Sequence, residues 1–172
     1  IDAEKIEELI TPKTKAIFII HYGGYACDLE KIIEICRKYN IVLIEDAAHA
    51  IDGYYKDKPL GSFGSLSVFS FHETKNISCG EGGLFIANDP SYYPRAEILR
   101  DKGTNRSAFF QGLVDKYNWV DVGSSFVLSD ILSALLYSQL KKLDVIQQKR
   151  LAAWNVYSKT LSVLEEKDIC SI

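Results

Sequence analysis

The chain has 172 residues, which is the length of about one domain. Apolar residues make up 47% of it and charged residues 25%, a balance typical of a packed globular core. The net charge of −3 gives no electrostatic reason to expect nucleic acid or an anionic membrane as a partner, and no apolar run approaches the roughly 20 residues that span a bilayer.

The N-terminus and the cysteines carry two further expectations. The chain begins with Ile1 and contains no methionine, so we expect an internal fragment of a longer protein. No C-x-x-C pair and no histidine at zinc-ligand spacing accompanies the cysteines, so no metal site is predicted. We expect free thiols in a reducing, cytoplasmic compartment, with a disulfide pair as the less favoured alternative. The cysteines are Cys27, Cys36, Cys79 and Cys170.

The first part of the chain predicts two helices and two strands. Residues 2–10 have helical spacing of apolar residues after an aspartate that can cap a helix. Residues 16–20 (AIFII) form a short continuous apolar run, as expected for a strand buried on both faces. Helical spacing returns over residues 28–39, and residues 41–44 (IVLI) form another buried strand. Strand, helix and strand with short connections predict a right-handed βαβ unit.

A small hairpin over residues 54–60 and strands at 66–71 and 84–87 are predicted next, so the sheet has at least four strands with helical connections. Helical spacing then marks residues 91–100 and 128–143. A last helix is predicted over residues 145–165. Its inner face is expected to carry Ala152, Ala153, Val156, Tyr157, Leu161 and Leu164.

The stretch between these helices, residues 101–126, has little periodicity. A long irregular segment inside a compact chain is usually functional or disordered. Its aromatic residues argue against disorder, so we expect an ordered functional segment. These aromatic residues are Phe109, Phe110, Tyr117, Trp119 and Phe126.

An acidic pair, Glu45 and Asp46, follows the IVLI run. Ligands of open α/β sheets lie at the carboxyl ends of the strands, so a carboxylate here is placed to face a buried cationic group. An acidic helix cap or a salt bridge to a nearby lysine is the alternative interpretation.

A lysine, Lys75, lies where a predicted strand runs into a turn and a glycine-rich stretch, SVFSFHETKNISCGEGG (67–83). A lysine amine in a partly buried pocket becomes a nucleophile toward carbonyl compounds, and glycine and serine allow close approach to a phosphate. The alternative is an exposed turn lysine beside hairpin glycines. Together, Asp46 and Lys75 meet the two needs of pyridoxal phosphate, an acidic partner for its ring nitrogen and a lysine for its aldehyde. The residue types alone leave other uses of the pair open.

Three segments resemble one family. EDAAHA (45–50), GSFGSLSVFSFHETKN (61–76) and EGG (81–83) are similar to the DegT/DnrJ/EryC1/StrS sugar aminotransferases, fold-type I pyridoxal-phosphate enzymes that act on nucleotide-linked keto-sugars. The resemblance covers nearly the whole chain. It implies an α/β fold in which residues 1–143 are the second half of the large domain, a mostly parallel sheet flanked by helices. Residues 144–172 would then be a connecting helix toward a small C-terminal domain.

The resemblance also implies roles for individual residues. Lys75 matches the Schiff-base lysine, which also moves the substrate proton, and Asp46 matches the partner of the pyridine nitrogen. His49 stands where the family has Gln or His near the ring hydroxyl, and Ser70 matches a hydroxyl that contacts the phosphate. Ser125 stands where many members have Asn reaching the partner subunit's phosphate.

The resemblance further implies a reaction. Residues 102–126 are most similar to members that move an amino group, from glutamate, onto C4 of a dTDP-linked 4-keto-6-deoxyhexose for enterobacterial surface-polysaccharide synthesis. A homodimer with a shared active site is the expected assembly. Dehydratase relatives have His where this chain has Lys75, which favours transamination. Alternatives are the same chemistry at C3 or on a UDP- or GDP-linked sugar, and a non-catalytic relative, against which the presence of both Asp46 and Lys75 argues.

Several other residues invite functional interpretations. We interpret His21 as a structural, hydrogen-bonded histidine rather than a base. Trp119 and Trp154 are interpreted as packing or interface residues. Three basic residues could meet a nucleotide diphosphate or simply form a solvated charged face. These three are Arg100, Lys102 and Arg106.

Overall fold

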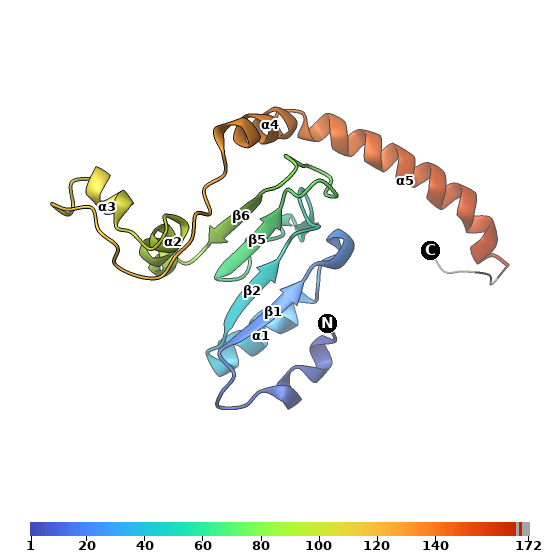
Figure 1. The fold of residues 1–172 in the computed structure, drawn as a ribbon. Helices are drawn as coiled ribbons and strands as arrows, with labels where there is room; N and C mark the ends of the chain where they lie inside the picture. Colours follow the sequence, from blue (N-terminus) through green and yellow to red (C-terminus); the bar gives the residue numbers. More distant parts are fainter. Residues whose placement is uncertain (168, 170–172) are drawn as a thin grey trace.

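A four-stranded sheet in the order β1-β2-β5-β6 forms the centre of the molecule (Figure 1). The structure, a computed structural model, describes residues 1–167 and 169. The first three strands are parallel, and β6 pairs antiparallel with β5. The predicted α/β fold with a mostly parallel sheet of four strands is therefore confirmed. The strands are β1 (Ala16–Ile20), β2 (Val42–Asp46), β5 (Leu66–Ser70) and β6 (Gly83–Ala87).

The predicted βαβ unit is present, with α1 (Leu29–Tyr39) between the parallel strands β1 and β2. Asp28 caps α1, because its side chain accepts a hydrogen bond from the backbone N–H of Lys31 at 3.3 Å. Asn40 ends the helix with a φ of 52°, a left-handed conformation that asparagine tolerates. Local sequence therefore sets both ends of this helix.

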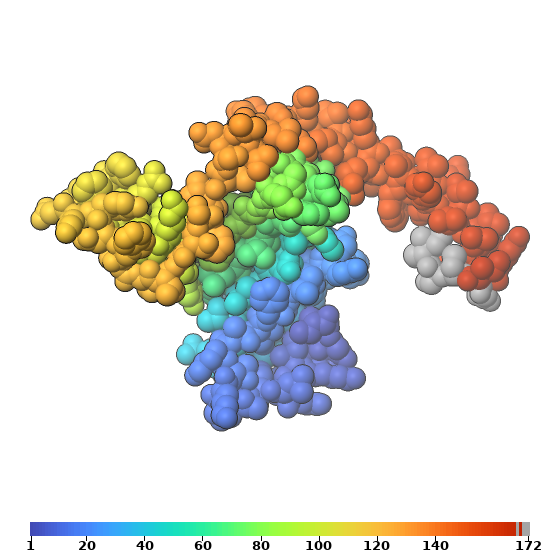
Figure 2. Space-filling view, viewed as in Figure 1, coloured from blue at the N-terminus to red at the C-terminus, as the bar shows by residue number. Residues whose placement is uncertain are grey.

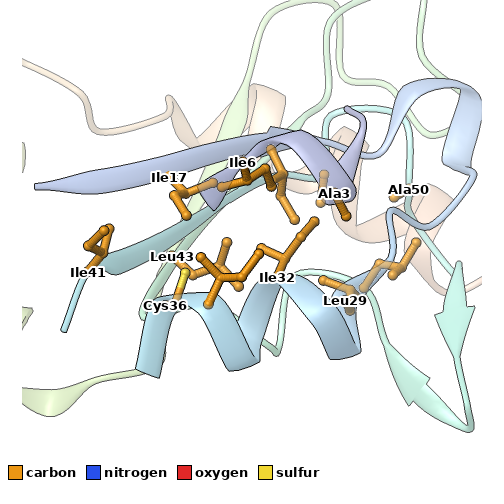
Figure 3. Close-up of a cluster of buried hydrophobic side chains, with 13 residues drawn as sticks. Ala3, Ile6, Ile17, Leu29, Ile32, Cys36, Ile41, Leu43 and Ala50 are labelled. Atoms are coloured by element: carbon orange, nitrogen blue, oxygen red, sulfur yellow. The ribbon is translucent and has the colours of Figure 1, made fainter. Parts of the chain in front are cut away.

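The main core lies between α1 and one face of β1 and β2. Figure 3 shows α1 side chains such as Leu29 and Ile32 packing toward Ile17 and Leu43 of the strands. A smaller core under the ends of β5 and β6 contains Phe71, Ile77 and Cys79, and residues of the later helices pack against it. These residues are Leu132, Leu136, Leu143 and Ile146, together with Leu128 just before the first of these helices.

Two predictions for the N-terminal part are wrong. Residues 2–10 form two short 3-10 helices, Ala3–Lys5 and Glu7–Leu9, rather than one α-helix, since a segment of this length is too short to be stable on its own. Strand β1 is buried on one face only: Phe18 is 54% and Ile20 49% exposed. Within the described residues α1 covers one face of this part of the sheet and no helix covers the other.

The remaining elements follow the predicted order. The hairpin consists of β3 (Tyr54–Tyr55) and β4 (Lys58–Pro59). A 3-10 turn, Pro90–Tyr92, and α2 (Tyr93–Arg100) follow the sheet, and residues 101–126 contain one short helix, α3. Helix α3 spans Arg106–Phe110. The two longer helices that were predicted then close the described chain: α4 (Asp130–Leu140) and α5 (Leu143–Glu165).

Helix α5 projects from the body of the molecule as an arm (Figures 1 and 2). The prediction of an apolar inner face on this helix is wrong for the described chain, because Val156 and Tyr157 are exposed and only Leu143 and Ile146 at its start pack against a core. Trp154 is exposed as well, as is Trp119. No helix in the described residues combines the length and apolarity needed to cross a bilayer.

The cysteines of the described chain are free thiols, as predicted. Cys36 and Cys79 are buried among apolar side chains, and Cys27 is half-buried. Burial raises the pKa of the Cys36 thiol, which keeps it protonated and unreactive. Cys170 lies outside the described residues.

Candidate active site at the carboxyl edge of the sheet

The carboxyl ends of β2 and β5 meet at one edge of the sheet because these neighbouring strands are parallel. A cavity of about 360 Å³ opens at this edge. Three of the predicted site residues line it: Lys75, His49 and Ser70. The other lining residues are Gly23, Ala48, Ile51, Thr74, Asn76 and Arg150.

Lys75 lies in the turn that follows β5. Its backbone N–H donates to the carbonyl of His72 at 2.9 Å, which closes the turn, and its side chain is half-buried. Ser70 Oγ accepts the backbone N–H of His72 at 3.3 Å, so the hydroxyl that ends β5 also holds this turn. No carboxylate within residues 1–167 pairs with the Lys75 amine. The amine is therefore held at the cavity without a competing ion pair.

Asp46 is the last residue of β2 and is half-buried. It pairs with Val68, two residues before Ser70, so the alternation of side chains puts Asp46 and Ser70 on the same face of the sheet. Its Oδ1 accepts the backbone N–H of Ala48 at 2.9 Å. Asp46 does not line the cavity itself, but it is anchored directly beside residues that do.

His49 is fixed by the turn that follows β1. Its Nδ1 accepts the backbone N–H of Gly23 at 3.2 Å, and its ring meets that of Tyr22 edge-on with 5.3 Å between centroids. The turn Tyr22–Gly24 places Gly23 at a φ of 64°, which glycine adopts at no steric cost. Three strand ends therefore contribute to the cavity, since β1 supplies Gly23, β2 supplies His49 and β5 supplies Lys75.

A buried pair, His21 and Glu45, supports this edge from the other face of the sheet. Both side chains are fully buried, and His21 Nε2 lies 2.9 Å from Glu45 Oε2. Glu45 also accepts the backbone N–H groups of Gly61, Phe63 and Gly64 at 2.6–2.9 Å. Burial alone would raise the pKa of Glu45, but these hydrogen bonds, led by that from His21, lower it below its usual value. The structural interpretation of His21 is confirmed.

Sequence reasoning missed the role of Glu45, which it treated only as part of an acidic pair. The structure gives this pair two separate roles, because consecutive strand residues point to opposite faces. The available signal was strand alternation: Glu45 faces the same way as Leu43 and therefore into the core. Its partners 16–19 positions away follow no local pattern.

A second cavity, of about 590 Å³, adjoins the first and shares five lining residues with it: Gly23, His49, Ile51, Asn76 and Arg150. The first half of α5 forms one wall, and the space beneath the α5 arm is visible in Figure 2. Gln147 of α5 donates to Asp52 at 3.3 Å and so ties the helix to the turn after β2. The sequence did not predict that α5 contributes to the site.

Ser125 does not line either cavity. It is exposed and forms an isolated bridge with Asp101 in the segment beside α2 and α3, which Figure 1 shows at the opposite end of the molecule from α5. Two of the three candidate phosphate-binding cations pair with the buried Asp101: Arg100 at 3.1 Å and Arg106 at 3.8 Å. This pairing favours a structural role for both. No group of side chains in the described residues is arranged to hold a metal ion.

A parallel α/β sheet with a lysine, a carboxylate and a hydroxyl gathered at its carboxyl edge defines a candidate cofactor-binding enzyme domain. The chain belongs to the DegT/DnrJ/EryC1/StrS aminotransferase family, whose model matches residues 1–172. The family resemblance inferred from residues 45–50, 61–76 and 81–83 is therefore confirmed.

Individual relatives give the same result. The chain is 36% identical over 159 residues to the UDP-4-amino-4,6-dideoxy-N-acetyl-beta-L-altrosamine transaminase of Helicobacter pylori, covering 92% of this chain and 41% of that protein. It is 35% identical over 168 residues to an uncharacterized protein of Methanocaldococcus jannaschii, covering 96% of this chain and 44% of the relative. The chain thus spans about two-fifths of the length of these relatives.

Solved structures share the fold. The Helicobacter pylori aminotransferase PseC, involved in the biosynthesis of pseudoaminic acid, superposes with a TM-score of 0.85 at 34% identity, over 94% of this chain and 42% of that one. An aminotransferase from Psychrobacter cryohalolentis gives a TM-score of 0.86 at 28% identity, over 96% and 43%. A Streptococcus pneumoniae sugar aminotransferase solved in a PLP form gives 0.81 at 26% identity, over 94% and 45%. Aminotransferases of this family use pyridoxal phosphate.

Proposed function

We propose that this chain carries the cofactor-binding lysine of a pyridoxal-phosphate-dependent aminotransferase acting on a nucleotide-linked keto-sugar. The observation that carries the proposal is the cavity at the carboxyl edge of the sheet, where Lys75, His49 and Ser70 meet beside Asp46. Membership of the aminotransferase family supports it.

The groups at this edge fit pyridoxal phosphate chemically. Lys75 would bind the aldehyde carbon, and Asp46 would keep the pyridine nitrogen protonated. Ser70 would donate a hydrogen bond to the phosphate, and His49 would lie near the ring hydroxyl. The small Ala48 and Gly23 leave the cavity wall open for a flat ring. When bound, the cofactor supplies an electron sink for a carbanion on the substrate.

Two residues of the chain would have a role in this reaction, Lys75 and Asp46. Lys75 Nζ would hold and return a proton at the substrate carbon, as general acid–base catalysis requires. No ion pair with a described residue engages the Lys75 amine, so the amine is available to carry this proton. Asp46 would be held in position beside the ring, because its Oδ1 accepts the backbone N–H of Ala48 at 2.9 Å. The half-buried positions of both side chains limit competition from water.

The particular substrate has two supported candidates. The similarity of residues 102–126 to dTDP-4-amino-4,6-dideoxygalactose transaminase supports amination, from glutamate, at C4 of a dTDP-linked 4-keto-6-deoxyhexose, for lipopolysaccharide or enterobacterial common antigen. The Helicobacter pylori relative, named for a UDP-linked sugar, supports a UDP-linked substrate. We place the dTDP-linked sugar first, because the run at 102–126 is long and unusual.

The proposed assembly is a cytoplasmic homodimer with a shared active site. Ser125 is exposed and outside the cavities of its own chain, which suits a group that reaches a partner subunit's phosphate. The exposed Trp119 in the same segment suits an interface. Residues 144–172 would lead into the small domain; of these, 168 and 170–172 lie outside the described residues.

The cofactor and its lysine are tested by visible absorption of the full-length protein with pyridoxal phosphate. We expect an absorption band that borohydride bleaches, and we expect both this band and the activity to be absent from a Lys75→Ala variant. A Lys75→Ala protein with full turnover would sink the proposal. Absence of the band from both proteins would instead favour a non-catalytic relative.

The sugar is tested with paired substrates. The full-length enzyme is given glutamate with the dTDP-linked or the UDP-linked 4-keto-sugar, and the product is analysed by NMR. We expect turnover of the dTDP-linked sugar with the new amine at C4. Turnover restricted to the UDP-linked sugar, or amination at C3, would overturn the finer assignment and leave the family chemistry in place.

A further inference from the structure

The proton on His21 has a defined place. The ring is fully buried, and its Nδ1 accepts the backbone N–H of Cys27 at 3.3 Å. A neutral imidazole with an accepting Nδ1 carries its proton on Nε2. That nitrogen lies 2.9 Å from Glu45 Oε2, so His21 donates to the carboxylate. The loop from His21 to Cys27 is thereby anchored at two atoms of one buried ring.

Glu45 extends this anchor across the sheet. Its two oxygens accept four hydrogen bonds in total, one from His21 and three from the backbone of residues 61–64. The segment before β5 and the turn after β1 are therefore held by the same carboxylate. A displacement of Glu45 would loosen both.

The turn that His21 anchors also fixes the His49 ring. The backbone N–H of Gly23 lies 3.2 Å from His49 Nδ1, and a backbone N–H can only donate. Nδ1 is therefore the acceptor, and the proton of the neutral ring is on Nε2. Within the part of the chain that the structure describes, Nε2 has no hydrogen-bond partner, while the His49 ring lines both cavities.

We infer that the turn Tyr22–Gly24 locks His49 in the Nε2–H tautomer, so that the ring is a hydrogen-bond donor to an oxygen atom in the Lys75 cavity. His21 and Glu45 are positioning residues that act through this turn. The identity of that oxygen, the ring oxygen of pyridoxal phosphate, rests on the proposed function; the tautomer does not.

Two variants of His49 test whether its ring acts as a hydrogen-bond donor through Nε2. Glutamine places its amide at the position of Nε2, whereas asparagine places its amide at the position of Nδ1. We expect His49→Asn to lower kcat/KM about 10- to 100-fold, the effect of a lost charge-assisted hydrogen bond, and His49→Gln to recover most of that loss. Equal loss in both variants, or full activity in both, would overturn the inference.

The tautomer of His49 can be measured in the absence of cofactor and substrate. Solid-state nitrogen NMR of the histidine-labelled full-length protein reports the protonation of each ring nitrogen, and the His49 signals are those that disappear in His49→Gln. We expect an unprotonated Nδ1 and a protonated Nε2. A protonated Nδ1, or a mixture of tautomers, would overturn the lock even if the enzyme binds its cofactor. If the His49 ring carries its proton on Nε2 but the protein binds no cofactor, the inference holds and the proposed function is refuted.

The positioning role has its own control. Glu45→Gln should shift the His49 nitrogen signals toward a mixture of tautomers. Glu81→Gln removes the exposed carboxylate that lies 3.7 Å from His72, and should leave the His49 signals unchanged. Unchanged His49 signals in Glu45→Gln would show that Glu45 does not position this ring. The wild-type measurement tests the lock even where Glu45→Gln fails to fold.

Discussion

Replacing Glu45 by Gln tests how much the buried carboxylate stabilises the fold. In the wild-type protein Oε1 accepts the N–H groups of Phe63 and Gly64, and Oε2 accepts those of His21 and Gly61. A glutamine keeps one of the two oxygens and turns an NH₂ group toward the other pair of donors. Two buried N–H groups therefore lose their acceptor in either orientation of the amide.

The cost follows from those two donors. A buried donor without a partner costs about 1–3 kcal/mol. His21 cannot relieve the conflict by moving its proton to Nδ1, because that nitrogen faces the N–H of Cys27. For two such donors we therefore expect Glu45→Gln to lower the free energy of unfolding at pH 7 by about 2–6 kcal/mol.

Urea denaturation followed by circular dichroism measures this difference and its pH dependence. The pKa of Glu45 is lowered in the folded protein, so its contribution is complete above the ordinary glutamate pKa of about 4.3 and is lost as the pH falls through the lower, folded pKa. The gap between wild type and variant should therefore narrow below about pH 4. A gap under about 1 kcal/mol at pH 7, or one that persists unchanged at about pH 3, would refute the reasoning.

Glu7 supplies the matched control. Its pKa is also lowered, first by the hydrogen bond from Lys38, but the pair is exposed at the surface. Water and salt screen such pairs, so Glu7→Gln should leave the unfolding curve where it is. The comparison isolates burial as the cause of the Glu45 effect.

Three further changes test other parts of the structure. Asp46→Asn keeps an acceptor for the backbone hydrogen bond but removes the charge, and should lower kcat by about 100- to 1,000-fold with little change in melting temperature; a retained kcat would contradict the role of Asp46. Gly64→Ala would bring a Cβ to 2.6 Å from the carbonyl oxygen of Leu43, and should destabilise the fold by about 1–3 kcal/mol in urea denaturation. Leu132→Ala should cost about 2 kcal/mol, since Leu132 packs against the smaller core, while Ile131→Ala, at an exposed position, should match wild type; equal effects would contradict the packing of α4.

Local patterns predicted the elements of the sheet because they depend on neighbouring residues. The run at residues 16–20 matched β1, and Asp28 marked the start of α1. Lys75 was predicted from its place between a strand and a glycine-rich stretch, and His49 and Ser70 from the family resemblance; the structure brings these three together. The function of each one stays a prediction.

What the sequence did not predict depends on distant contacts. Whether Phe18 or Val156 is buried is decided by what packs against it, and an apolar stripe does not identify its partner. Glu45 finds its acceptor role only when residues 61–64 fold back over the sheet. The wall that α5 gives to the second cavity likewise requires the turn after β2 to be in place.

Strand β1 has a consequence for how the protein must be handled during synthesis. It lies at one end of the sheet, so half of its backbone N–H and C=O groups face no neighbouring strand in the described chain, and the side chains of Phe18 and Ile20 are half-exposed. An apolar, uncharged edge of this kind recruits strands from other molecules. Until it is covered, the segment of residues 16–20 is therefore open to pairing with a strand of another molecule.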